Sequence, residues 1–112
     1  DMLAHTGKIK QTIKAVEYVD ANLRRIVDAA LKKGGTVCIT ADHGNAEELI
    51  NRENGEIDTE HSKSKVPFLL IRGKAKIRIR RHGILADVAP TVLHLLGIPQ
   101  PKLMTGKSLL RL

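Results

Sequence analysis

The chain is 112 residues long, carries a formal net charge of +7 at pH 7, and is 42% hydrophobic. That length suits one modest globular unit, and a single Phe, a single Tyr and no Trp require an aliphatic core. No apolar run approaches the roughly 20 residues that span a bilayer, and no signal-peptide pattern is present. Because Cys38 is the one cysteine, no intrachain disulfide can form. We therefore expect a cytoplasmic protein without a membrane partner. Because Asp1 stands where an initiator methionine would, we also expect a piece of a longer polypeptide.

The first expected element is a long amphipathic helix over residues 8–33. Apolar residues recur there at steps of three and four, which places them along one face. Thr6 is the expected N-cap, and the KKGG run at 32–35 supplies cations and then glycine to end the helix. The apolar positions are Ile9, Ile13, Val16, Val19, Leu23, Ile26, Val27, Ala30 and Leu31.

Short strands and helices are expected to follow this helix. Residues 36–40 (TVCIT) and 66–71 (VPFLLI) are apolar runs typical of buried strands. Between them, AEEL predicts a short helix and NRENGEID predicts a surface loop or hairpin. Residues 84–97 predict a second amphipathic helix that Asp87 can cap. This order predicts an α/β fold with parallel strand pairing.

Much of the positive charge lies in RGKAKIRIRR, residues 72–81, where basic residues alternate with Ala75, Ile77 and Ile79. Alternation of this kind predicts an edge strand with one charged, solvated face. A nucleic-acid patch is the alternative, but no aromatic residue is interleaved to stack on bases. We therefore expect no nucleic-acid partner.

Residues of the kinds that ligate metals occur in three places. Asp1 and His5 are four positions apart, Asp42 and His43 follow the first expected strand, and His61 precedes the second. Functional groups of α/β sheets gather at the carboxyl ends of strands. Each residue taken alone has a plainer reading as a cap, a surface pair or a solvated histidine. Their joint occurrence favours a metal site, and the mixture of carboxylate and imidazole suits Zn²⁺, Mn²⁺ or Fe²⁺ better than Ca²⁺.

Two other motifs do not hold. The TGKS stretch at 105–108 resembles the end of a phosphate-binding loop, but Pro101 stands where that loop requires glycine. Cys38 lies inside an apolar strand, which predicts a buried small hydrophobe rather than a nucleophile.

Five stretches, in this order, resemble the cofactor-independent phosphoglycerate mutases of the alkaline phosphatase superfamily. They are DMLAHTG, AVEYVD, ITADHGNAE, HSKSKVPF and GILADVAPTVLHLLGIPQPKLMTGKSL. The resemblance covers essentially the whole chain but only the C-terminal part of a full-length mutase. It implies that 1–112 is part of the metal-binding phosphatase domain, with a mostly parallel sheet flanked by helices. The N-terminal part and the inserted substrate-binding domain would be absent.

The resemblance implies interconversion of 3-phosphoglycerate and 2-phosphoglycerate through a phosphoserine, without 2,3-bisphosphoglycerate. Two Mn²⁺ ions are implied, with Zn²⁺, Co²⁺ or Mg²⁺ as alternatives. Asp1, His5 and His61 would bind the first ion, and Asp42 and His43 the second. The serine nucleophile is expected upstream, since Ser62, Ser64 and Ser108 do not match its context. The family's HTAHT is DTEHS here, so Asp58 replaces a histidine while His61 keeps the ligand position.

The intact enzyme is expected to be a glycolytic monomer, and the isolated piece to be inactive and prone to self-association. Two alternatives stay open. One is another member of the superfamily, such as a phosphopentomutase or a metal-dependent phosphohydrolase. The other is a non-catalytic module whose basic strand binds an anionic partner.

Overall fold

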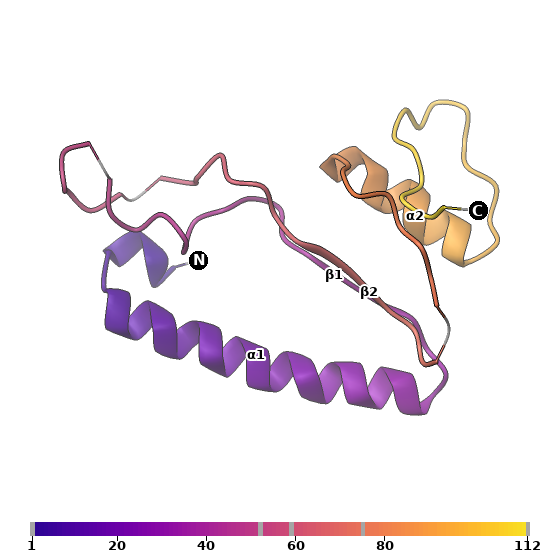
Figure 1. Ribbon diagram of the computed structural model, residues 1–112, viewed down its shortest axis with the longest axis horizontal. Coiled ribbons are helices and arrows are strands. Elements are labelled where there is room, and N and C mark those ends of the chain that lie inside the picture. The colour runs from indigo at the N-terminus through magenta and orange to yellow at the C-terminus, as the bar shows by residue number, and fades with distance from the viewer. Residues whose placement is uncertain (1, 52, 59, 75, 112) are drawn as a thin grey trace. The chain divides into compact units, whose positions relative to one another are not determined.

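The computed structural model contains helices, two strands and long connecting segments (Figure 1). Its contacts group the chain into two compact units, Asp1–Gly73 and Lys74–Leu112, which are described separately below. The expected α/β class is confirmed, whereas the assignment of 1–112 to a single domain stays a prediction. No helix within the described ranges is long and apolar enough to cross a membrane. The residues described are 2–51, 53–58, 60–74 and 76–111.

The first unit begins with a short 3-10 helix, η1 (Ala4–Thr6), followed by the long helix α1 (Ile9–Lys32). The expected helix over 8–33 is therefore confirmed to within one residue at each end. The expected N-cap is wrong: Lys8 occupies that position, without a side-chain hydrogen bond. The reason is that Thr6 belongs to η1, where its hydroxyl donates to the carbonyl oxygen of Leu3 at 2.6 Å.

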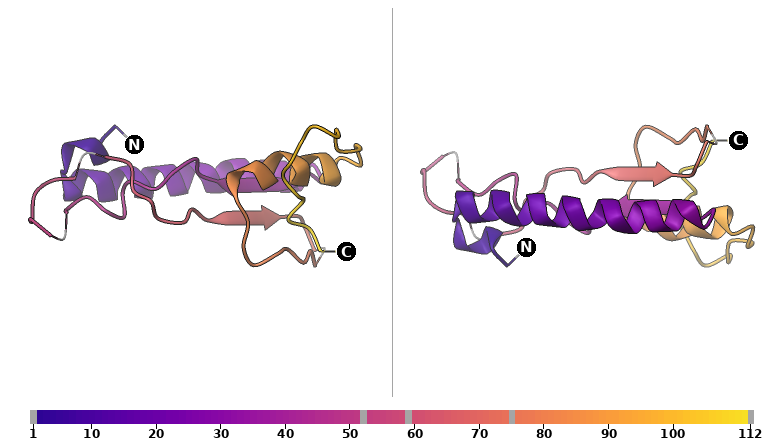
Figure 2. Two further views of the ribbon diagram at one scale, coloured as in Figure 1. Left: turned by 90° about the horizontal axis from the view of Figure 1, so that it is seen from above. Right: turned by 90° about the horizontal axis from the view of Figure 1, so that it is seen from below.

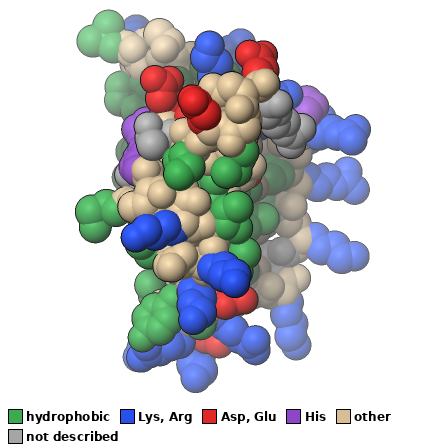
Figure 3. Space-filling view, turned by 90° about the vertical axis from the view of Figure 1, so that its left-hand side faces the viewer, with side chains coloured by type: hydrophobic (Ala, Val, Ile, Leu, Met, Phe, Trp, Pro, Cys, Tyr) green, Lys and Arg blue, Asp and Glu red, His purple; other side chains and the backbone are tan. Residues whose placement is uncertain are grey.

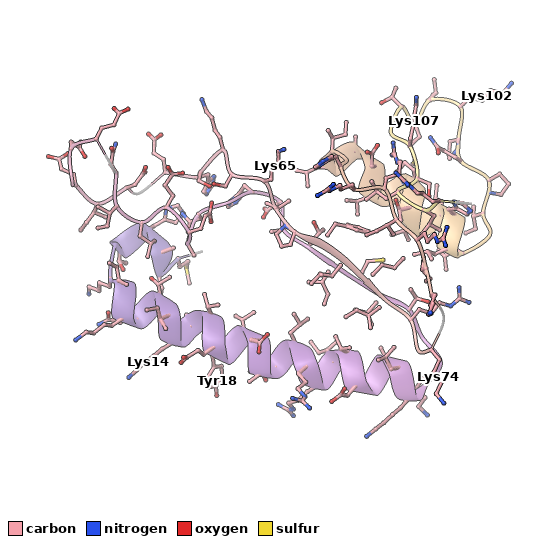
Figure 4. The ribbon with its side chains drawn as sticks, in the orientation of Figure 1. Lys14, Tyr18, Lys65, Lys74, Lys102 and Lys107 are labelled. Carbon is pink, nitrogen blue, oxygen red and sulfur yellow. The ribbon has the colours of Figure 1, made fainter. Side chains whose placement is uncertain are left out.

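Helix α1 runs alongside the two strands of the first unit and contacts β1 (Figure 2). Its apolar face is only partly covered. Near the C-terminal end Leu23, Val27 and Leu31 are half-buried. On the opposite side, Lys14 and Tyr18 point away from the strands (Figure 4). Several apolar residues that belong to the stripe remain 48–65% exposed: Ile9, Ile13, Val16, Val19 and Ile26.

The two strands, β1 (Val37–Thr40) and β2 (Phe68–Ile71), form an antiparallel pair. Their register runs from Val37↔Ile71 to Thr40↔Phe68, and single antiparallel bridges at Gly44↔Ser62 and Ile50↔Ile57 continue the arrangement in a shifted register. Segments 37–50 and 57–71 are thus the two arms of one long hairpin. The expectation of a mostly parallel sheet is not met by these strands. Parallel pairing needs a crossover connection, usually a helix, whereas this connection doubles back on itself.

The connection between the strands also corrects the expected AEEL helix. Residues 46–47 form a turn, in which Glu48 N–H donates to the carbonyl oxygen of Asn45 at 3.0 Å. Side chains here bond to nearby backbone and so compete with helix formation, because Glu47 accepts from the Asn45 N–H. The predicted hairpin at NRENGEID is confirmed by the bond from Asn51 N–H to the carbonyl oxygen of Glu56 at 2.8 Å.

The second unit contains the 3-10 helix η2 (Leu85–Asp87) and helix α2 (Val88–Leu95), which confirm the expected helix near 84–97. Asp87 is 6% exposed, and its carboxylate accepts from the N–H of Ile84 at 3.1 Å and of Lys107 at 2.7 Å. Asp87 occupies the N-cap position of α2, as expected, but its side chain makes no capping bond to α2 and instead caps η2 and tethers the C-terminal segment.

The basic stretch at 72–81 forms no extended strand among its described residues. Its pairing is limited to the bridge Ile79↔Leu110, flanked by a bond from Arg80 N–H to the carbonyl oxygen of Leu109 at 2.7 Å. The alternation holds at Ile77 and Ile79, which are half-buried. Arg80 departs from it because its guanidinium lies 3.3 Å from the carboxylate of Asp87. Ala75 lies outside the described residues.

Candidate metal centre

Three histidines from separate parts of the first unit meet beside the hairpin. The rings of His43 and His61 stack with centroids 3.6 Å apart and an interplanar angle of 19°. His5, from η1, lies against His61 with centroids 5.2 Å apart. Figure 3 shows histidine side chains at the surface of the end that carries the hairpin tip, near acidic side chains. Asp1, the other predicted ligand of this group, lies outside the described residues.

The hairpin places His43 and His61 diagonally across from each other. Each histidine is next to a member of the bridge Gly44↔Ser62, in which Ser62 N–H donates to the carbonyl oxygen of Gly44 at 2.9 Å. A second link crosses the arms one residue further out, where the Asn45 amide donates to the carbonyl oxygen of Glu60 at 3.2 Å. This backbone bridge and the bond from the Asn45 side chain explain why two residues far apart in the sequence form one ring stack.

A close contact at Gly7 brings His5 to the same place. Gly7 has a left-handed φ of 63°, and a Cβ built there would overlap the side chain of Ile57. Glycine therefore lets the turn between η1 and α1 lie directly against the hairpin tip. His5 lies two positions before Gly7, in η1, and so is held near His61.

The Asp42–His43 pair has the geometry of two ligands that share one cation. His43 Nδ1 lies 3.2 Å from the carbonyl oxygen of Gly44, which can only accept, so the ring proton belongs on Nδ1. Nε2 then carries the lone pair and lies 3.5 Å from Asp42 Oδ2. Two donors bound at 2.0–2.2 Å to a tetrahedral ion are about 3.4 Å apart. The Asp42 carboxylate is 86% exposed and the His43 side chain 30%, so a cation can reach both.

The residue types in this cluster fit a metal site, whereas their arrangement fits one only in part. Imidazole and carboxylate groups suit divalent first-row metals. The described residues do not, however, place three His, Cys, Asp or Glu side chains around one point. The structure thus gathers His5, His43 and His61 and pairs Asp42 with His43. The assignment of five ligands to two ions stays a prediction.

Sequence reasoning assigned no role to Glu47 or Ser62, which lie beside the histidines. The Glu47 carboxylate accepts hydrogen bonds from the Ser62 hydroxyl and from Asn45 N–H, the latter at 2.9 Å. These bonds, that from Ser62 first, lower the pKa of Glu47 from 4.5 to about 2. A signal was available: the NAE that follows the Asp-His-Gly turn, and a hydroxyl residue directly after His61.

Cys38 is not part of this cluster. It is half-buried in β1, and that burial raises the pKa of its thiol. A raised pKa leaves less thiolate at neutral pH, which fits the prediction of a packing residue rather than a nucleophile.

Comparison with known proteins assigns the chain to a family. The family described as the Metalloenzyme superfamily matches residues 1–100. The chain belongs to this superfamily. That membership agrees with a cluster of imidazole and carboxylate side chains at the surface of the first unit.

This superfamily member is similar to proteins named 2,3-bisphosphoglycerate-independent phosphoglycerate mutase. The protein from Synechocystis sp. (strain ATCC 27184 / PCC 6803 / Kazusa) is 48% identical over 118 residues, covering 98% of this chain and 22% of the relative. Mutase 2 from Methanosarcina barkeri is 52% identical, covering 98% of this chain and 21% of the relative. The resemblance seen in the motifs is therefore confirmed, over about a fifth of the relatives' length.

The superfamily member is also similar to a solved structure of Leishmania mexicana phosphoglycerate mutase, determined at low cobalt concentration. The TM-score is 0.83 with 32% sequence identity, over 100% of this chain and 23% of that protein. The likeness therefore extends to the fold of both units.

Proposed function

We propose that this chain supplies metal ligands to a 2,3-bisphosphoglycerate-independent phosphoglycerate mutase, which interconverts 3-phosphoglycerate and 2-phosphoglycerate. The observation that carries the proposal is the Asp42–His43 pair, with His43 Nε2 3.5 Å from Asp42 Oδ2 and its ring stacked on His61. The names of relatives at 48–52% identity support the choice of reaction. In this proposal the enzyme acts in glycolysis in the cytoplasm and needs no 2,3-bisphosphoglycerate.

Two Mn²⁺ ions are the proposed cofactors, with Zn²⁺, Co²⁺ or Mg²⁺ as alternatives. Asp1, His5 and His61 would hold the first and Asp42 and His43 the second. Two divalent cations at such a site neutralise charge on phosphoryl oxygens and activate an oxygen nucleophile. The cobalt named for the Leishmania mexicana structure supports a divalent metal.

The chain's own groups prepare this site in defined ways. The carbonyl oxygen of Gly44 holds His43 in the tautomer that presents Nε2 as a ligand. The exposed carboxylate of Asp42 adds negative charge that favours a cation over a neutral ligand. Both groups lie just past the end of β1, so the strand limits how far they can move apart.

The serine that carries the phosphoryl group in the proposed reaction is not one of the serines near these ligands. The Ser62 hydroxyl donates a hydrogen bond to the Glu47 carboxylate and accepts one from the N–H of Ser64 at 3.2 Å. The hydroxyl of Ser108, in the second unit, pairs with His94 Nδ1 at 2.9 Å. Because Ser62, Ser64 and Ser108 do not match the sequence context of the family's nucleophile, we assign the nucleophile to sequence outside this chain.

A chimera tests the proposal directly. The corresponding segment of the Methanosarcina barkeri mutase is replaced by this chain, and conversion of 3-phosphoglycerate is followed with enolase as the coupling enzyme. We expect the chimera to turn over with Mn²⁺ present. The 112-residue chain assayed by itself is expected to show no turnover, because it lacks the serine.

Ligand substitutions in the chimera provide the decisive comparison. His43→Ala and His61→Ala are each expected to lower activity by at least about 100-fold, since changes to groups that merely orient ligands already cost 10–100-fold. His82→Ala is the matched control, because His82 is an exposed histidine of the second unit. Full activity in His43→Ala would contradict the proposed site.

A further inference from the structure

A side-chain link crosses the hairpin at the level of the two stacked histidines. One oxygen of the Glu47 carboxylate accepts from the Asn45 N–H at 2.9 Å, within the turn that follows His43. The other accepts from the hydroxyl of Ser62, which directly follows His61 on the opposite arm. A single carboxylate thus connects both arms.

We infer that Glu47 and Ser62 are positioning residues that hold the His43–His61 stack in the geometry in which each histidine would bind its own divalent cation. The inference rests on the proposed function, because it assigns these residues to the same metal site. The hydrogen bond from Ser62 to Glu47 adds to the bridge Gly44↔Ser62 and the Asn45–Glu60 hydrogen bond in a sparsely paired part of the hairpin. The ladder of β1 and β2 ends at Thr40↔Phe68, and beyond it Gly44↔Ser62 is a single bridge.

The packing at Gly44 shows how closely this link lies over the backbone. A Cβ built at position 44 would overlap both the Glu47 carboxylate and the Ser62 hydroxyl. Because glycine has no side chain, the hydrogen bond can form across the chain at this point. The same residue presents the carbonyl oxygen that His43 Nδ1 faces, so the link and the ligand share one backbone segment.

The link is expected to act on geometry more than on the stability of the unit. Glu47 is exposed, and a hydrogen bond in contact with water contributes little to the free energy of unfolding. A carboxylate that accepts hydrogen bonds is nevertheless a directional anchor, because both of its oxygens have fixed partners here. Removing it leaves the Gly44↔Ser62 bridge and the hydrogen bond from the Asn45 side chain to the carbonyl oxygen of Glu60 to oppose sliding of the arms, and so loosens the ring stack.

The test uses the chain in its metal-free form and then with metal ions. Ser62→Ala removes the hydroxyl, Ser62→Thr retains it, and Glu47→Gln removes the charge of the acceptor. Glu48→Gln is the matched control, since Glu48 is an equally exposed neighbour. Ring stacking is read by nuclear Overhauser effects between the His43 and His61 rings. Binding of Mn²⁺ and of Co²⁺ is then titrated, with the Co²⁺ absorption bands reporting ligand geometry.

We expect Ser62→Ala and Glu47→Gln to lose the ring-to-ring effects and to bind both ions at least about 10-fold more weakly. Ser62→Thr should restore the effects and bind within about twofold of the unsubstituted chain, as should Glu48→Gln. Helical circular dichroism should be the same in all variants.

The inference is overturned if Ser62→Ala keeps the ring-to-ring effects, if Ser62→Thr fails to restore them, or if the unsubstituted chain lacks them. These signals come from the metal-free chain, so they decide the inference even where metal binding fails. Loss of metal binding in the unsubstituted chain, with the stack intact, would count against the proposed function instead.

Discussion

At the scale of single residues, backbone carbonyls and amides decide what the side chains can do. The carbonyl oxygen of Gly44 favours the His43 tautomer with its proton on Nδ1, which leaves Nε2 as the acceptor nitrogen. In the second unit the amides of Ile84 and Lys107 converge on Asp87, which keeps a buried carboxylate ionised. In both places the polar side chain is useful because neighbouring backbone groups orient it.

Asp87 provides a prediction about pH. Hydrogen bonding from Lys107 N–H, with Ile84 N–H and the Arg80 charge, holds the pKa of Asp87 below its usual 3.8 despite burial. A carboxyl with a depressed folded pKa contributes stability that is fully present above 3.8 and is lost as pH falls through the folded value. We expect amide hydrogen exchange at Lys107 and Leu109 to be strongly protected at pH 7 and to lose protection only as the pH falls below 3.8.

Asp87→Asn tests the cause of that pH dependence. It should lower the free energy of local opening by about 1–3 kcal/mol at pH 7, because buried N–H donors lose a charged acceptor. The variant should also show no acid-dependent loss of hydrogen-exchange protection. Protection factors measured at both pH values check this, and a variant that retains the full acid dependence would assign it to another group.

At the scale of elements, close backbone contacts that only glycine permits are as important as the hydrogen-bonded pairing of the strands. The C-terminal segment lies against η2 at Gly106, where a Cβ would overlap the carbonyl oxygen of Ala86. Thr91, fully buried, donates to the carbonyl oxygen of Asp87 at 2.6 Å and accepts from Leu109 N–H at 2.8 Å. The TGKS stretch therefore serves packing in this unit.

Gly106→Ala is expected to destabilise the second unit by about 3 kcal/mol, because the overlapping atom is backbone and cannot move aside. Gly97→Ala is the comparison, since its φ of 68° is strained for alanine while no atom lies within 4 Å of the added Cβ. Its cost should be about 1 kcal/mol. Thermal unfolding followed at 222 nm measures both, and an equal or larger loss in Gly97→Ala would contradict the role given to Gly106.

The sequence predicted elements well where the pattern was long. Helix α1 has 24 residues with a regular apolar stripe and a KKGG end, so its bounds were predicted to within one residue. The AEEL helix was wrong because four residues carry too little periodicity to outweigh local hydrogen bonds such as that from Asn45 N–H to Glu47. Parallel pairing was wrong because a run such as VCIT is compatible with either direction.

The candidate site was predictable in its residue types but not in its geometry. Spacing alone indicated His5, His43 and His61, and the structure brings all three together. Their stacking depends on the register of the hairpin, which a sequence pattern does not specify. The same register creates the link between Glu47 and Ser62, and for that reason it could not be predicted from either residue alone.

At the scale of the whole molecule, the apolar face of α1 is the most conspicuous open surface. Val16 and Ile26 are 53% and 63% exposed although they belong to the stripe that predicts burial. Apolar surface left in water favours association with other apolar surface. The expected self-association of the isolated chain stays a prediction, and this face is where we expect it to occur.

Val16→Ser should therefore reduce self-association of the chain, seen as a lower weight-average mass in sedimentation velocity at a fixed concentration. Tyr18→Ser is the control, because Tyr18 is 76% exposed and points away from the strands (Figure 4). Both replacements put serine into the same helix, so their effects on helix propensity are similar. An equal decrease in the two variants would show that the stripe is not the associating surface.

The long hairpin has a consequence for the order in which the cluster is assembled during folding. His43 and His61 lie 18 positions apart and meet when one loop closes, an event whose entropy cost rises only slowly with loop length. Hairpins form in roughly 1–10 μs, well before slower docking steps. His5 can join only after α1 has folded back along the hairpin. A divalent cation in the refolding solution would therefore encounter the His43 and His61 imidazoles already stacked, before His5 has joined them.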